Sequence, residues 1–419
     1  MTTDVQVYVD IDDDTVHAGH LYSHRRRQSE SAGFTYADPY LTRPDAYALD
    51  PALPLVSGTQ HTPLGVRLFR ALADTSPDRW GRNLILRAER VRARDARTTA
   101  RSLSELDLLL GVRDDLRQGA LRLRTAAGTT FLAPESSGVP HLIDLPSLLS
   151  AADHLAGDDA DDDQLMALLR AGSSLGGARP KAHVLDPSGR LCIAKFPSSA
   201  SDGWNVMAWE KTALDLAAKA GIEVPESTLV KVADRDVLVV GRFDRAGRRR
   251  IGYCSAMTML EAADGDVRSY IDIAEVVEER SPSPTRHLHQ LWRRVAFSVL
   301  ISNTDDHLRN HGFLHLTAGQ WSLSPAFDLN PNPDPGPKYL STAIDGDDTA
   351  ASIALLMRVA PIFRLGPDEA RAVLADVVDA HTRWPTVAAS HGLVHSAIAD
   401  MAPAFEHSQA ERAREIARR

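Results

Sequence analysis

The sequence predicts an α+β fold of two lobes, in which a β-rich lobe precedes a helical lobe. Two hairpin patterns lie between residues 181 and 240, and apolar residues at helical spacing dominate from about residue 285. The length of 419 residues agrees with a division into two or three units, because domains average roughly 150 residues. A cleft is expected where the lobes meet, and such clefts are common ligand sites.

Charge and composition exclude several classes of protein. The chain has 47 Lys and Arg against 56 Asp and Glu, a net charge of −9, which argues against a protein that coats nucleic acid, although local basic patches can still act. Its two cysteines exclude a disulfide framework and a cysteine-rich zinc site. The acidic start lacks the pattern of a signal peptide, and no apolar run approaches ~18 residues. We therefore expect a cytoplasmic protein that does not bind a membrane.

The first 125 residues alternate between strand and helix patterns. Valines at every second position of segment 5–9 predict a strand, and a second strand is expected around residues 18–22. Apolar spacing predicts helices over 64–74 and 80–94. Residues 119–124 predict a further short strand.

The next part of the chain contains the two hairpins. Residues 181–185 and 191–196 flank an Asp-Pro-Ser-Gly turn, and residues 229–232 and 237–240 form the second pair. Between the hairpins, residues 205–220 predict a helix that ends before a glycine. The apolar stripe of the later helix consists of Leu288, Leu291, Trp292, Val295, Ala296, Val299 and Leu300.

Three polar residues follow that helix in an order that suggests phosphoryl transfer. Asp305 and Asn310 lie in the polar loop after the helix, and Asp328 lies beyond a short apolar stretch. A carboxylate accepts the proton of an attacking hydroxyl, whereas amide and carboxylate oxygens suit Mg²⁺. An Asp, an Asn five positions later and a further Asp after a hairpin follow the order of a protein-kinase catalytic loop and metal-binding Asp. The alternative is an ordinary polar loop at the end of a helix.

A kinase also needs a strand lysine that binds phosphates, and Lys195 fits this role because it lies inside an apolar strand. Glu210, in the following helix, is the candidate partner of that lysine. Small residues over 172–178 allow a backbone to approach phosphates, but Ala178 stands where a Walker A loop requires lysine. The alternatives are an edge-strand lysine, an exposed helical glutamate and an ordinary turn.

A metal site is the competing interpretation of the catalytic region. His307, His311 and His315 have the i, i+4, i+8 spacing that would align three imidazoles for zinc on a helix. Residues 312–316 alternate as a strand does, which breaks that alignment. A Ser/His/Asp hydrolase is weaker still, because no Gly-x-Ser-x-Gly motif is present.

Taken together, these stretches resemble the HipA family, the bacterial serine/threonine-protein kinase toxins of HipBA-type toxin–antitoxin systems. The similar motifs cover most of the chain and are specific in combination. They comprise Phe69-Arg70-Ala71-Leu72 with Ser76-Pro77-Asp78-Arg79-Trp80-Gly81, Gly119-Ala120-Leu121-Arg122, Gly176-Gly177-Ala178-Arg179-Pro180-Lys181, Gly221-Ile222-Glu223-Val224-Pro225, Arg242-Phe243-Asp244-Arg245, the loop 305–310 and Phe327-Asp328.

The resemblance implies a bilobal protein-kinase-like fold. Residues 1–125 would form a HipA-type N-terminal subdomain, and residues 126–244 the rest of a β-rich N-terminal lobe with the phosphate loop. Residues 245–419 would form an all-helical C-terminal lobe with the catalytic loop and the metal-binding Asp.

The resemblance also assigns roles to the candidate residues. Asp305 would be the catalytic base, Asn310 and Asp328 would hold Mg²⁺, and Lys195, with Glu210 as its candidate partner, would contact the phosphates of ATP. The other implied ATP-binding positions are Gly176, Gly177, Ala178, Gly241, Phe243 and His307, with the backbone near Gly241 and Phe243 facing adenine.

The family's regulatory serine corresponds to Ser174, and Ser173 is its neighbour. Autophosphorylation there would add nearly two negative charges beside a phosphate site and expel the loop; the alternative is an ordinary loop serine. Two positions depart from the family. Arg309 replaces the usual lysine, which keeps the charge but changes the geometry, and Gly241 replaces a glutamate.

The implied function is that of an ATP- and Mg²⁺-dependent kinase toxin that phosphorylates a translation-related protein such as an aminoacyl-tRNA ligase. The implied partner is a HipB-like helix-turn-helix antitoxin, through which the chain would mainly reach operator DNA. The basic runs 25–27 and 248–250 are interpreted as solvated surface. The alternatives are a pseudokinase-like binding subunit and a kinase of a small molecule.

Overall fold

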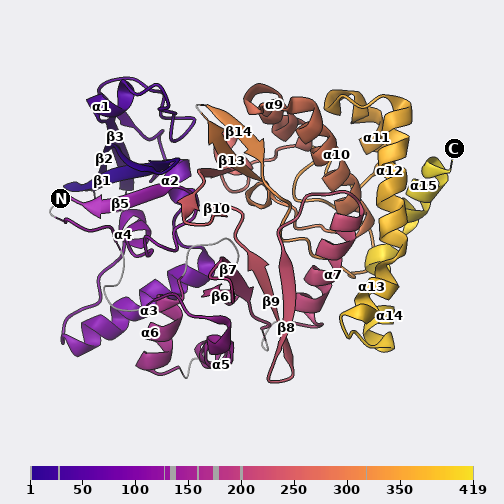
Figure 1. The fold of residues 1–419 in the computed structure, drawn as a ribbon, viewed down its shortest axis with the longest axis horizontal. Helices are drawn as coiled ribbons and strands as arrows, with labels where there is room; N and C mark the ends of the chain where they lie inside the picture. Colours follow the sequence, from indigo (N-terminus) through magenta and orange to yellow (C-terminus); the bar gives the residue numbers. More distant parts are fainter. Residues whose placement is uncertain are drawn as a thin grey trace.

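The computed structural model describes residues 2–26, 29–126, 128–132, 138–157, 160–172, 179–198, 202–317 and 319–418. Figure 1 shows an elongated molecule with a first sheet at one end, a second sheet in the middle and a group of helices at the other end. In the described part of the chain, no helix is long and apolar enough to cross a membrane.

The first sheet is antiparallel, with the strand order β4-β3-β2-β1-β5. Its strands are β1 (Thr2–Ile11), β2 (Asp14–Arg26), β3 (Ser29–Tyr36), β4 (Thr59–His61) and β5 (Leu121–Thr125). The alternating residues Val5, Val7 and Val9 are fully buried, which confirms the predicted strand and its inward face. The strands predicted around 18–22 and 119–124 are also confirmed, within β2 and β5.

The described residues up to 125 also contain the helices α1 (Asp38–Leu41), α2 (Arg70–Asp74), α3 (Arg79–Asp95) and α4 (Glu105–Leu110). The helix predicted over 80–94 is confirmed as α3. The helix predicted over 64–74 is wrong in its first half, because only α2 is helical. Gly65 adopts a left-handed φ of 85° in a turn after Pro63, and Leu64 is fully exposed. Helical spacing without a buried partner surface therefore formed no helix there.

The second sheet is also antiparallel, with the order β6-β7-β9-β8, and it confirms both predicted hairpins. Its strands are β6 (Lys181–Leu185), β7 (Leu191–Lys195), β8 (Ser227–Val232) and β9 (Arg235–Gly241). The second hairpin turns through Ala233 and Asp234, both with positive φ, as a two-residue type I′ turn requires.

Helices cover both faces of this second sheet. Helix α7 (Val206–Lys219) confirms the predicted helix; Asn205 caps its start, and Gly221, at φ 76°, follows its end. The opposite face packs on α3 and on α5 (Leu145–Ala156) and α6 (Asp162–Arg170), where Trp80 and Leu84 of α3 join the buried residues of the sheet. Part of the N-terminal region is thus built into the core of the second sheet.

The C-terminal part is mainly helical. Its helices are α8 (Ala256–Met259), α9 (Tyr270–Arg280), α10 (Pro284–Leu300), α11 (Ile353–Val359), α12 (Pro367–Thr382), α13 (Trp384–Ser390), α14 (His395–Phe405) and α15 (Ser408–Ala417). The predicted apolar stripe of α10 is buried along its whole length. One continuous hydrophobic core runs from the first sheet through α7 to α15.

The bilobal fold is confirmed, but the C-terminal lobe is not purely helical. It contains a three-stranded sheet of β12 (Tyr253–Ser255), β13 (Gly312–Thr317) and β14 (Gln320–Leu323), and a two-stranded ribbon of β10 (Arg245–Ala246) and β11 (Arg249–Arg250). The strand pattern of residues 312–316 already indicated β13. Phe313, Trp321 and Leu323 bury their side chains on one face of this small sheet. Their packing stabilises a sheet of only three strands. The domain boundaries at residues 125 and 244 stay a prediction.

Candidate active site

Lys195 joins the two lobes at the proposed catalytic cleft. Its Nζ lies 2.5 Å from Glu210 Oε1 of α7 and 2.8 Å from Asp328 Oδ1 of the C-terminal lobe. The side chain of Glu210 is almost completely buried. The predicted pairing of the strand lysine with the helical glutamate is therefore present in the structure, and the edge-strand and exposed-helix alternatives do not describe it.

The electrostatics of this triad favour the charged lysine. Burial alone would lower the pKa of Lys195, but the carboxylates of Asp328 and Glu210 hold it above its usual range. Burial would likewise raise the pKa of Asp328, but Lys195 lowers it to about 2. Burial raises the pKa of Glu210, which Lys195 opposes. The triad therefore contains a charged lysine and, in Asp328, a strongly acidic carboxylate.

The loop after α10 places Asp305 and Asn310. The chain leaves the helix through Ser302, whose φ is 54°. The backbone oxygen of Asp305 then accepts hydrogen bonds from His307 N (2.9 Å) and Asn310 Nδ2 (3.1 Å). The Asp305 residue remains exposed, and its carboxylate makes no hydrogen bond within the described residues. Partial desolvation raises its pKa, opposed by His307 and supported by the carboxylates of Asp328 and Asp306. Such a carboxylate is free to accept a proton.

Asp306 holds this loop against α9 and α10, a role that the sequence did not indicate. Its buried carboxylate accepts hydrogen bonds from Tyr270 Oη (2.6 Å) and Ser298 Oγ (3.1 Å) and lies 3.1 Å from His311 Nε2. Burial would raise its pKa, but His311 and the hydroxyl donors hold it below its usual value. The Asp-Asp pair in the sequence marks the loop, yet only tertiary contacts distinguish the exposed Asp305 from the buried Asp306.

Asp328 follows the small C-terminal sheet in a left-handed conformation, with φ 58°. Asn330 Nδ2 lies 3.3 Å from its Oδ1, and Asn330 N donates to Asn303 Oδ1 at 3.3 Å. The preceding residue, Phe327, contacts Phe243, with 5.5 Å between ring centroids. The aromatic pair brings the metal-binding candidate next to the segment that joins the lobes.

The donor set fits a hard divalent cation. Asp328 uses Oδ1 for Lys195 and Asn330, which leaves Oδ2, and Asn310 uses its amide nitrogen, which leaves Oδ1. Mg²⁺ is usually held by one or two protein oxygens together with substrate phosphates. A zinc site receives no support: among the described residues, no group of three or more His, Cys, Asp or Glu is placed to hold a metal. His311 faces Asp306, whereas His315 stacks on Tyr47 at 3.7 Å.

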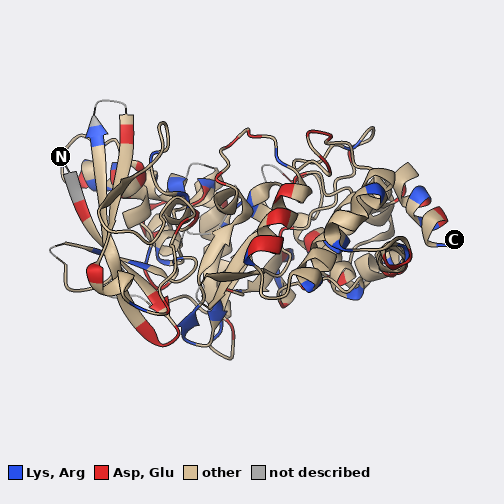
Figure 2. Cartoon of the chain, turned by 90° about the horizontal axis from the view of Figure 1, so that it is seen from above, with Lys and Arg blue, Asp and Glu red and all other residues tan. Residues whose placement is uncertain are grey.

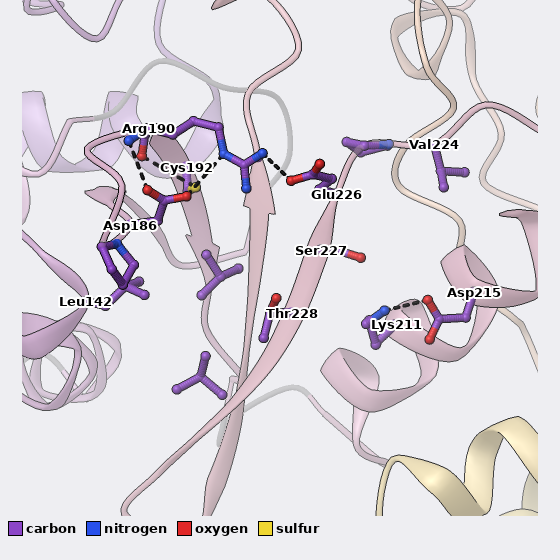
Figure 3. Close-up of a pocket in the computed structure, with 15 residues that line it drawn as sticks. Leu142, Asp186, Arg190, Cys192, Lys211, Asp215, Val224, Glu226, Ser227 and Thr228 are labelled. Carbon is purple, nitrogen blue, oxygen red and sulfur yellow. Dashed lines mark hydrogen bonds and ion pairs between the residues drawn. The ribbon is translucent and has the colours of Figure 1, made fainter. Parts of the chain in front are cut away.

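The segment after β9 contains the predicted adenine-facing residues. Lys195 pairs with Leu238 of β9, and Gly241 lies three positions further along that strand. Because successive side chains point to opposite faces of a sheet, a side chain at position 241 would point away from the face that carries Lys195. A Cβ on Gly241 would instead lie 3.5 Å from Arg190. A pocket of about 660 Å³ beside Gly241 is lined by Arg190, Cys192 and Glu226 and by Lys211 and Asp215 of α7 (Figure 3). The absence of a glutamate side chain at position 241 therefore concerns this pocket and not the face of the sheet that carries Lys195.

The next positions concern the phosphate loop, its serines and Arg309. Ser173, Ser174, Gly176, Gly177 and Ala178 lie outside the described residues. Arg309 forms an ion pair with the exposed Asp264, with 2.5 Å between Nη1 and Oδ1 and 3.1 Å between Nη2 and Oδ2.

The predicted solvated basic runs are only partly exposed. Arg250 is buried in an ion pair with Asp114 at 2.8 Å, so that residue is not solvated surface. Arg249 is exposed and pairs with Asp12. Arg25 donates to Ser102 O at 2.9 Å, and Arg27 lies outside the described residues.

Comparison with known proteins adds a family match. The sequence profile described as the HipA-like C-terminal domain matches residues 173–384, about half of the chain. The chain is 27% identical over 230 residues to Y4dM of Sinorhizobium fredii and 25% identical over 135 residues to a protein of Haemophilus influenzae, both named as candidate kinases. These matches cover 46% and 29% of this chain, and 53% and 39% of those proteins, so the chain spans about half of their length or less.

The whole fold is similar to a solved structure. In the complex of HipA, HipB and operator DNA from the toxin–antitoxin system of Shewanella oneidensis MR-1, one chain matches with a TM-score of 0.69 at 15% identity. The match covers 99% of both chains. The likeness therefore extends over the N-terminal region as well as the profile-matched part.

Proposed function

The chain belongs to the HipA family, and we propose that it is an ATP- and Mg²⁺-dependent serine/threonine-protein kinase that acts as the toxin of a type II toxin–antitoxin system. The observation that carries this proposal is the position of Lys195 between Glu210 and Asp328. Asp305 interacts electrostatically with Asp328, and its backbone oxygen binds Asn310. A scaffold protein has no need of all these groups together.

Each of these residues has a separate role in the proposed reaction. Lys195 binds phosphate oxygens of ATP, and Glu210 keeps its amine in place when phosphates compete with Asp328. Asp305 accepts the proton of the acceptor hydroxyl as that oxygen attacks the γ-phosphorus. The new oxygen–phosphorus bond forms while the bond to the β,γ-bridging oxygen breaks, and ADP leaves with that electron pair. Asp328 and Asn310 would hold Mg²⁺, which neutralises charge on the phosphates when bound.

Nucleotide binding uses the segment between the lobes and the phosphate loop. We assign adenine to the backbone at Gly241 and Phe243, where the Phe243 ring lies against Phe327. The glycines of the phosphate loop and His307 complete the proposed ATP site. Ser174, with Ser173 beside it, is the proposed site of inactivating autophosphorylation.

The proposed partners follow from the family. A HipB-like helix-turn-helix antitoxin would bind this chain and carry most of the contacts to operator DNA, in the cytoplasm. The net charge of −9 and the intermixed basic and acidic residues in Figure 2 agree with indirect rather than extensive DNA contact. The proposed substrate is a translation-related protein such as an aminoacyl-tRNA ligase.

The test is transfer of label from γ-labelled ATP with Mg²⁺. The acceptors are the chain itself, aminoacyl-tRNA ligases and a panel of small hydroxyl metabolites, followed by phosphoamino-acid analysis. We expect phosphoserine or phosphothreonine with the native chain and none with Asp305→Ala. Labelling of small molecules alone would instead assign a metabolite kinase, and equal labelling by Asp305→Ala would contradict the proposed mechanism.

A further inference from the structure

A short turn of the N-terminal region touches both lobes of the molecule. It consists of residues 74–78, Asp74-Thr75-Ser76-Pro77-Asp78, and joins α2 to α3. Its last residue bonds to Lys181 on β6 of the N-terminal lobe. Its first residue bonds to Ser255, at the junction of β12 and α8 in the C-terminal lobe. Two carboxylates four residues apart thus bridge the two sides of the cleft.

The Asp78 end is fixed to the strand beside the phosphate-binding lysine. One carboxylate oxygen of Asp78 caps α3 by accepting from Gly81 N at 2.7 Å, and the other pairs with Lys181 Nζ. Both paired side chains are about 5% exposed. Trp80 Nε1 also donates to the backbone oxygen of Lys181 at 3.2 Å. Lys181 is the cross-strand partner of Lys195, so this contact holds the neighbouring strand at the level of the cleft.

The Asp74 end is fixed to the support of the catalytic loop. Its carboxylate accepts from Ser255 N at 2.7 Å and Ser255 Oγ at 2.9 Å. Ser255 pairs with Gly312 of β13, and Ala256 N donates to His311 O at 2.7 Å. These contacts lie immediately after Asn310 in the chain. Asp74 is therefore separated from the catalytic loop by one pair of strands.

The turn also contacts a buried arginine. Arg117 is fully buried, and its guanidinium donates to Thr75 O at 3.3 Å. The backbone oxygen of Arg117 accepts from the guanidinium groups of Arg242 (3.2 Å) and Arg245 (2.6 Å), in the segment that joins the lobes. The segment that joins the lobes and the turn are thus connected through one buried arginine.

We propose that residues 74–78 form an interlobe strap, in which Asp74 and Asp78 are positioning residues that hold the strands around Lys195 at the correct distance from Asp305. This inference rests on the proposed function. Phosphoryl transfer depends largely on placement of the phosphate-binding and proton-accepting groups, and a displacement of about 1 Å can reduce a rate by about 100-fold. Through the strap, the N-terminal region helps to set the geometry of the active site.

The kinetic test uses Asp74→Asn, Asp78→Asn and the double variant. Asparagine keeps the shape of the side chain. At position 78 it keeps the helix cap but removes the charge that binds Lys181. At position 74 it replaces one of the two oxygens that accept from Ser255 with an amide nitrogen. We expect each single variant to lower kcat at least tenfold while KM for ATP stays within threefold. Because release at either end frees the strap, the double variant should be no slower than the slower single variant.

The matched control is Asp50→Asn. Asp50 is buried and accepts from Ala71 N at 2.6 Å and Ala52 N at 2.8 Å, so its hydrogen bonds stay within the N-terminal region. We expect it to lower the melting temperature but to leave kcat unchanged. Additive losses of kcat from the two ends, or an equal loss in the control, would overturn the strap.

A second measurement tests the strap independently of the proposed kinase activity. Spin labels are placed on Cys introduced at the exposed residues Thr228 of β8 and Glu275 of α9, because the native Cys192 and Cys254 are buried. We expect one narrow interlobe distance in the native background and in Asp50→Asn, and a broad or shifted distribution in either strap variant. Narrow, unshifted distances in both strap variants would overturn the strap even if phosphoryl transfer is found. A native chain without phosphoryl transfer would overturn the proposed function and leave the distance test intact.

Discussion

Lys195 and Glu210 form a buried ion pair, with 2.5 Å between Nζ and Oε1. The pair connects the end of β7 to the second turn of α7, and its lysine also reaches Asp328 across the cleft. A lysine shared by two carboxylates is poised to exchange one of them for phosphate oxygens.

The first prediction concerns Glu210→Gln. Without the glutamate charge, Lys195 stays paired with Asp328, so the buried cation remains compensated, but its amine is no longer aimed at the phosphates. We expect kcat/KM for ATP to fall by about tenfold or more, as measured by steady-state kinetics. Glu226→Gln, at an exposed carboxylate that pairs with Arg190 near β8, serves as the control and should behave as the native chain. Equal effects of the two variants would contradict the role of Glu210.

The second prediction concerns Asp328→Asn. This change removes the charged oxygen that suits Mg²⁺ but leaves the Lys195–Glu210 pair, so the melting temperature should change little. Activity titrated with Mg²⁺ should fall by about 100-fold and require more metal for half-saturation. An unchanged magnesium dependence would remove Asp328 from the metal site. Asp264→Asn, at an exposed carboxylate next to the catalytic loop, is the matched control.

The third prediction concerns Arg309→Lys, which restores the family's usual residue. Arg309 points to the exposed Asp264, and exposed ion pairs contribute only about 0–1 kcal/mol. We therefore expect kcat to stay within about threefold and the melting temperature to stay nearly constant. A tenfold change in kcat in either direction would show that this side chain takes part in the reaction.

The fourth prediction is a pH dependence of stability at His315. Burial lowers the pKa of this histidine from 6.5 to about 4, with opposing effects of Asp12 and Arg249, and its Nε2 is buried without a partner in the described structure. The unfolded chain therefore binds a proton between pH 6.5 and 4 that the folded chain does not. Stability is full above pH 6.5 and is lost as the pH falls towards 4, by about 3 kcal/mol for this one group.

Urea unfolding at several pH values tests this fourth prediction. His315→Phe keeps the stacking on Tyr47 and removes the titrating group. The difference in unfolding free energy between the variant and the native chain should change in favour of the variant as the pH falls. A difference that is independent of pH would contradict the assignment.

Local patterns predicted much of the fold and of the candidate site. The hairpins, α7 and α10 were predictable because each has its own turn or capping signal and a periodic apolar face. The pairing of Lys195 with Glu210 followed from the order of strand and helix. The order of Asp305, Asn310 and Asp328 predicts a catalytic loop there, and this assignment stays a prediction.

What the sequence did not predict depends on tertiary contacts. Residues 64–69 have helical spacing, but Gly65 turns the chain and Leu64 finds no surface to pack on. Asp305 and Asp306 are adjacent and chemically identical, and only the contacts of Tyr270 and Ser298 make one of them the buried anchor. The strap carboxylates Asp74 and Asp78 bond to residues 181 and 103 positions away, respectively. No local pattern encodes such partners.

The most direct test of the proposed mechanism compares ATP binding with phosphoryl transfer in Asp305→Ala. ATP affinity is measured by calorimetry with Mg²⁺, and transfer of labelled phosphate by rapid quench under single-turnover conditions. Since the proposed role of Asp305 is to accept a proton and not to hold the nucleotide, we predict an ATP affinity within about threefold of the native chain and a transfer rate at least about 100-fold lower. Transfer at the native rate by Asp305→Ala would contradict the assignment of this carboxylate as the catalytic base.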